Sequence, residues 1–70
     1  MPHHEVMKDK DYNLVSTLYH ALQGAETSAV YLRDAESQGD GDVAKYFRDT
    51  QSQYLQMAEQ AKELLSKRLK

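Results

Sequence analysis

Residues 37–42 read S-Q-G-D-G-D and divide the 70-residue chain into two segments of similar length. Gly39 suits the left-handed backbone conformation that ends many helices, because glycine has no Cβ atom to clash there. Asp40 or Asp42 can accept a hydrogen bond from a free backbone N–H in the first turn of a following helix. We therefore predict one helix before this stretch and another after it, joined by a loop over about residues 38–42.

Before the loop, apolar residues recur at alternating spacings of three and four, as they do on one face of an α-helix. They are Val15, Leu18, Leu22, Ala25, Ala29 and Leu32. The pattern predicts an amphipathic helix over about residues 11–37, with Asp9 or Asp11 capping its first turn. Gly24 lies inside this helix and costs it about 1 kcal/mol relative to alanine, so we expect another helix to approach closely there.

After the loop, the same spacing returns in Val43, Phe47, Thr50, Tyr54, Met57, Ala61 and Leu64. It predicts a second amphipathic helix over about residues 43–68. Both helices would be roughly 40 Å long at about 1.5 Å per residue. Matched helices on a short loop form an antiparallel hairpin. We therefore expect one hairpin domain over residues 11–70, preceded by a flexible arm over residues 1–10, which show no apolar period.

The composition excludes several classes of protein. The chain has no cysteine, which removes disulfides, thiolate metal sites and cysteine nucleophiles. Nine Lys and Arg against eleven Asp and Glu give a formal net charge of -2, so there is no basic footprint for nucleic acid. Neither a signal peptide nor a membrane-spanning apolar run is recognisable. We therefore expect a cytoplasmic protein that binds neither nucleic acid nor membrane.

Chain length argues for self-association. A domain this small buries only about 60% of the surface that its unfolded chain exposes, so a private core gives it little stability. A lone hairpin would leave part of the apolar surface in water, whereas two hairpins packed as a four-helix bundle bury it. We predict a homodimer whose core and dimer interface comprise Val15, Leu18, Leu22, Ala25, Ala29, Leu32, Phe47, Tyr54, Met57, Ala61 and Leu64.

Residues 18–36, L-Y-H-A-L-Q-G-A-E-T-S-A-V-Y-L-R-D-A-E, resemble the first helix of a ferritin-like or rubrerythrin-like hairpin, in which an inward glutamate binds metal. Glu26 is the residue that matches this ligand. The second helix of such families carries a Glu-x-x-His pair, but the matching positions here hold Tyr54 and Met57, which replace neither ligand. The resemblance therefore implies the four-helix fold without ferroxidase or peroxidase activity. We predict a non-catalytic structural, interaction or regulatory protein that needs no cofactor.

A metal-binding or redox function is the alternative. Two Glu26 carboxylates could meet at a dimer axis and hold a divalent ion. Otherwise Glu26 is a surface residue that pairs with Arg33 or reaches the hydroxyl of Tyr19. His4 is a second candidate ligand, because removal of Met1 would leave a Pro-His-His terminus with the donors for Cu(II) or Ni(II).

The aromatic residues also leave two interpretations open. Five tyrosines occur in the chain, and burial of their rings at helix seams, with the hydroxyls reaching water, would explain them. The alternative is a patch of exposed rings that docks another protein, centred on Tyr12 and Tyr19. His20 has no carboxylate three or four positions away, which favours a surface residue over a catalytic one.

Overall fold

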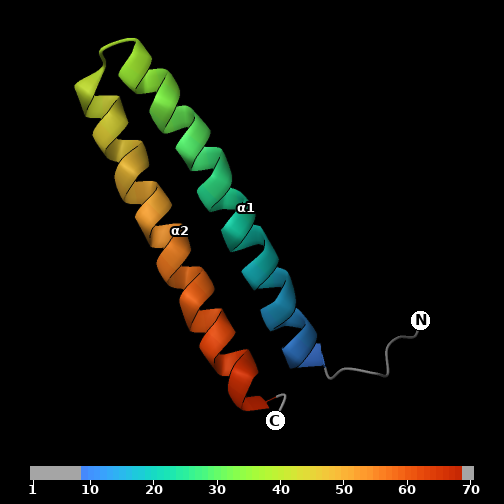
Figure 1. Ribbon diagram of the computed structural model, residues 1–70. Helices are drawn as coiled ribbons and strands as arrows, with labels where there is room; N and C mark the ends of the chain where they lie inside the picture. Colours follow the sequence, from blue (N-terminus) through green and yellow to red (C-terminus); the bar gives the residue numbers. More distant parts are fainter. Residues whose placement is uncertain (1–8, 69–70) are drawn as a thin grey trace.

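The computed structural model describes residues 9–68, in which α1 spans Asp9–Ser37 and α2 spans Gly41–Arg68. The two helices run antiparallel and side by side, so that the start of α1 lies beside the end of α2 (Figure 1). The predicted all-α hairpin is confirmed, and no strand occurs among the described residues. Most of the predicted arm, residues 1–8, lies outside them, and α1 begins before the predicted start, at Asp9.

The loop ends α1 with a Schellman motif centred on Gly39, whose φ is +70°. The N–H of Gly39 donates to the carbonyl of Glu36 at 3.1 Å. The N–H of Asp40 donates to the carbonyl of Ala35 at 3.0 Å. The Asp40 carboxylate then accepts a hydrogen bond from the N–H of Val43 at 3.2 Å, which caps the start of α2. Two adjacent residues therefore set the whole turn.

Small side chains form most of the contact between the helices. Alternating steps of three and four trace the seam on α1 through Asp11, Leu14, Leu18, Ala21, Ala25, Ser28, Leu32 and Ala35. The same steps trace it on α2 through Ala44, Phe47, Gln51, Tyr54, Ala58, Ala61, Leu65 and Arg68. Every buried residue of the described part of the chain lies in these two rows, and six of the nine are alanines. The hairpin therefore has a thin core.

An ion pair and a glycine contact join the two helices at defined positions along the seam. Arg68 Nε donates to Asp11 Oδ1, and the Asp11 side chain is only 12% exposed. Further along, the ring of Tyr54 lies against Gly24, where an added Cβ would stand 2.7 Å from the ring carbons. The close approach predicted at Gly24 is confirmed, because only a residue without a side chain leaves room for this ring.

The seam differs from the predicted apolar stripe. Leu18, Ala25, Leu32, Phe47, Tyr54 and Ala61 belong to both, and Ala29 is half-buried beside the seam. By contrast, Val15, Leu22, Met57 and Leu64 flank the seam and are 37–47% exposed in the single chain. Small residues occupy the most buried positions of the seam because they let the two helices approach closely.

Candidate interaction surface

The seam separates two long side faces of the hairpin, which differ in charge. The first, the uncharged face, comprises Asn13, Thr17, His20, Gly24, Thr27 and Tyr31 of α1 with Val43, Tyr46, Thr50, Gln53, Met57, Gln60 and Leu64 of α2. The second, the charged face, comprises Tyr12, Val15, Tyr19, Leu22, Glu26, Ala29, Arg33 and Glu36 of α1 with Lys45, Arg48, Ser52, Leu55, Glu59 and Lys62 of α2. The first set contains no Asp, Glu, Lys or Arg, whereas the second contains seven. The rows of the first set continue into charged residues at their ends, Lys10 and Asp34 on α1 and Lys67 on α2, so the uncharged face stops there.

A shallow groove of about 470 Å³ crosses the uncharged face between the two helices. Phe47 lines it, and the ring of Tyr31 stands edge-on to that of Phe47 with the centroids 5.3 Å apart. The ring of Tyr46 meets the same Phe47 edge-on at 5.1 Å. His20 and Tyr54 also line the groove, and no charged side chain does. Its lining is therefore aromatic, with neutral polar groups between the rings.

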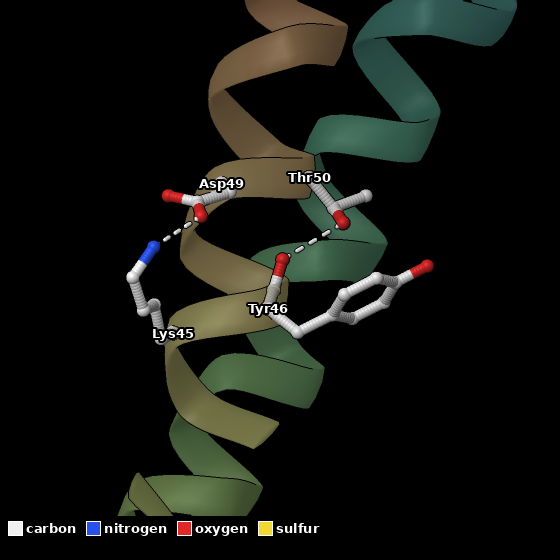
Figure 2. A network of polar contacts seen from close by, with 4 residues as sticks. All are labelled: Lys45, Tyr46, Asp49 and Thr50. Atoms are coloured by element: carbon white, nitrogen blue, oxygen red, sulfur yellow. Dashed lines mark hydrogen bonds and ion pairs between the residues drawn. The ribbon is translucent and has the colours of Figure 1, made fainter. Parts of the chain in front are cut away.

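Figure 2 shows how sharply the character of α2 changes from one residue to the next. Tyr46 and Thr50 lie on one side of the helix, where the Thr50 hydroxyl donates to the Tyr46 carbonyl at 2.8 Å. Lys45 Nζ donates to Asp49 Oδ2 at 2.7 Å on another side. The Thr50 hydroxyl is thus already hydrogen-bonded within its own helix, which lowers the cost of covering it.

Ion pairs lie on the charged face instead. Arg48 Nη2 lies 3.5 Å from Glu36 Oε2 across the two helices, and Lys62 Nζ lies 3.2 Å from Glu59 Oε2 along α2. All four side chains are more than half exposed. Pairs this exposed contribute between zero and about 1 kcal/mol to stability. They keep this face compatible with water.

Both faces nevertheless expose large apolar or aromatic side chains. On the uncharged face these are Tyr31, Val43, Tyr46, Met57 and Leu64, and on the charged face they are Tyr12, Val15, Tyr19, Leu22 and Leu55. Four of the five tyrosines are 48–64% exposed, and only Tyr54 is half-buried at the seam. In the single chain, burial at the seam therefore accounts for Tyr54 but not for the other four rings.

The structure does not bring the predicted metal ligands together. Glu26 is exposed on the charged face, and no group of three or more His, Cys, Asp or Glu side chains suited to a metal ion occurs within residues 9–68. No ion pair joins Glu26 to Arg33 in this range. The Tyr19 hydroxyl accepts instead from Gln23 Nε2 at 3.3 Å. His4 lies outside the described residues.

His20, Tyr54 and Met57 do not lie together as a set of ligands. The His20 ring is exposed and stands edge-on to Tyr19, with the ring centroids 5.4 Å apart. Tyr54 is occupied in packing on Gly24, and Met57 is 43% exposed on the uncharged face. These positions serve packing and surface rather than a ligand set.

The sequence prediction did not identify the uncharged face, although its signal is present. Val43, Thr50, Met57 and Leu64 recur every seven residues, and Tyr46, Gln53 and Gln60 form a parallel row. Between Val43 and Leu64 neither row contains a charge, which is unusual on the exposed side of a helix. Counting missing charges by heptad would have identified it.

Comparisons with protein-family models, curated proteins and solved structures found no match to this chain. No helix within residues 9–68 combines the length and apolar character needed to cross a membrane.

Proposed function

We propose that the protein is a non-catalytic helical hairpin that self-associates into a four-helix bundle and acts as a structural or interaction module in the cytoplasm. The proposal rests on one observation: the core holds small side chains, whereas large apolar side chains lie on the surface. The buried residues are mostly alanines, while eleven large apolar or aromatic side chains are 37–64% exposed.

The energetic consequence of this mismatch favours association. Fully burying a Val, Leu or Met side chain stabilises a fold by about 1.5–3 kcal/mol, which is more than an alanine can contribute. The hairpin uses its alanines to bring the helices together and leaves its larger side chains partly in water. A second copy that covers them would supply the stability that a private core of this size lacks.

The proposed assembly has the four helices of the superfamily that the first helix resembles, although Glu26 is exposed in this chain rather than inward. Two hairpins are the two halves of a ferritin-like bundle, and pairing them completes four helices. In this proposal the chain keeps the architecture of that superfamily and not its metal chemistry, because Tyr54 and Met57 stand where the Glu-x-x-His ligands would be.

Native mass spectrometry of untagged protein, with thermal unfolding at several concentrations, tests the proposal. We expect a mass near twice 8.0 kDa and an unfolding temperature that rises with protein concentration. A mass of 8.0 kDa with a concentration-independent transition would contradict self-association. Stoichiometric Mn(II) in the dimer, lost in Glu26→Gln, would contradict a purely structural role.

A further inference from the structure

We infer that the second copy packs against the uncharged face and leaves the charged face in water. The inference rests on the proposed self-association and goes further by naming the surface that carries it. It narrows the predicted interface, because Met57 and Leu64 belong to this face whereas Val15 and Leu22 do not.

Charge distinguishes the two faces. Covering the charged face would move the Arg48 and Glu36 side chains, now 56% and 54% exposed, out of water together with Lys45 and Lys62. Removing charges from water costs several kcal/mol per ion unless each finds a well-placed partner. Between Asn13 and Tyr31 of α1 and over residues 43–64 of α2, the uncharged face carries no such cost. The hydroxyl of Thr50 there already has its hydrogen bond.

The extent of the face suits a stable dimer. On α2 the face runs over residues 43–64, and at about 1.5 Å per residue this gives a length of roughly 33 Å. Two helices packed side by side are about 20 Å wide, so the face offers a footprint of roughly 660 Å². A specific protein–protein interface buries about 600–1,000 Å² on each partner.

The relief of the face makes it complementary to itself. Away from the loop, α1 presents the smaller Thr17 and Thr27, whereas α2 presents the larger Met57 and Leu64. Near the loop, both helices present a tyrosine ring, Tyr31 and Tyr46. A two-fold axis parallel to the helices would place α2 of each copy over α1 of the other. Large side chains would then fill the space above small ones, which is the packing that dense interfaces require. This match of shapes supports a second copy as the partner.

The position of Glu26 bears on the alternative function, a metal site at the dimer axis. Glu26 lies on the charged face, so two copies joined through their uncharged faces hold their Glu26 carboxylates on the outside of the bundle. A metal ion shared by the two carboxylates at the dimer axis is incompatible with this assembly.

Two matched variants test which face is covered. Met57 and Leu55 are 43% and 45% exposed on the same helix, but they belong to opposite faces. By sedimentation equilibrium, we expect Met57→Lys to raise the dimer dissociation constant at least about 100-fold, because a lysine would be buried without a partner. We expect Leu55→Lys to change it by less than about threefold, since its charge stays in water.

The outcomes separate the two proposals. A dimer that survives Met57→Lys, or that is lost equally in Leu55→Lys, overturns the uncharged-face interface and leaves self-association standing. A native chain that is monomeric overturns both.

A second measurement on the native chain applies if Met57→Lys does not fold. Tyr46 and Tyr12 are 64% and 63% exposed in the hairpin and lie on opposite faces. In hydroxyl-radical footprinting of the dimer, we expect Tyr46 to be modified several-fold more slowly than Tyr12. Equal rates, or slower modification of Tyr12, would overturn the inference.

Discussion

The uncharged and charged faces are built from adjacent residues of the same two helices. Tyr46 follows Lys45 directly, and Met57 follows Leu55 by two positions. Each face exposes five large apolar or aromatic side chains, yet the charged face also holds seven charged residues and the uncharged face none. Exposed apolar area therefore does not tell the faces apart. The cost of removing charges from water does.

The seam is the reference against which both faces are judged. Its buried positions are mostly alanines that lie between the two helices of one chain, whereas the large side chains of the two faces are exposed. A change in the seam should act on folding itself, and a change on a face should act on association or on neither.

The largest effect is expected at adjacent residues, one in the seam and one on the charged face. Ala21 is 2% exposed and Leu22 is 47% exposed. Ala21→Asp buries a carboxylate without a partner, which costs several kcal/mol and exceeds what a hairpin this small can lose. We expect far-ultraviolet circular dichroism to show an unfolded chain. Leu22→Asp should remain folded and dimeric, and loss of the dimer in that variant would place the interface on the charged face.

A smaller effect is expected at the ion pair between the helix ends. Arg68→Ala leaves Asp11, whose side chain is 12% exposed, without its partner. Because Arg68 itself is 36% exposed, we expect a loss of about 1–2 kcal/mol in the free energy of unfolding rather than the full cost of a buried pair. Arg48→Ala is the matched control, since its pair with Glu36 is more than half exposed. Urea denaturation should show a loss below about 0.5 kcal/mol there, and equal losses would refute the distinction.

The contact between Gly24 and Tyr54 should have an effect of similar or lower size. Gly24→Ala gains about 1 kcal/mol of helix propensity, but the new Cβ would lie 2.7 Å from the Tyr54 ring. Overpacking of this kind costs about 1–3 kcal/mol, so we expect a net destabilisation of about 1 kcal/mol. Gly41→Ala serves as the control, because a Cβ there meets nothing within 4 Å. A rise in melting temperature for Gly24→Ala would show that the ring is free to move.

The smallest effect should be that of salt on the dimer. Contacts between uncharged faces are not screened by ions, so raising NaCl from about 0.05 M to about 0.5 M should change the dissociation constant by less than about twofold. Analytical ultracentrifugation across this range checks the prediction. A dimer that weakens strongly with salt would indicate that ion pairs between charged faces hold the two copies together.

Local signals in the sequence were sufficient for the turn and the hairpin. Gly39 and Asp40 specify the Schellman motif and the cap through short-range chemistry. The alternating spacing also identified both helices, because helix period depends only on neighbours along the chain.

Local signals did not predict which residues of each helix face the other helix. Leu22 and Met57 are more hydrophobic than Ala21 and Ala58, so the stripe followed the larger residues, whereas close approach of the two helices selects the smaller ones. The pair between Asp11 and Arg68 depends on register across the hairpin, which no local pattern specifies. The uncharged face was missed because its signal is an absence, spread over two rows on each helix.

The central claim is that two copies meet through their uncharged faces, and intermolecular nuclear Overhauser effects in a mixture of ¹³C-labelled and unlabelled native protein test it most directly. We predict cross-peaks between the copies from the methyl groups of Met57 and Leu64, and none from those of Leu22 and Leu55. Intermolecular cross-peaks from Leu22 and Leu55, or none from any methyl group, would contradict the claim.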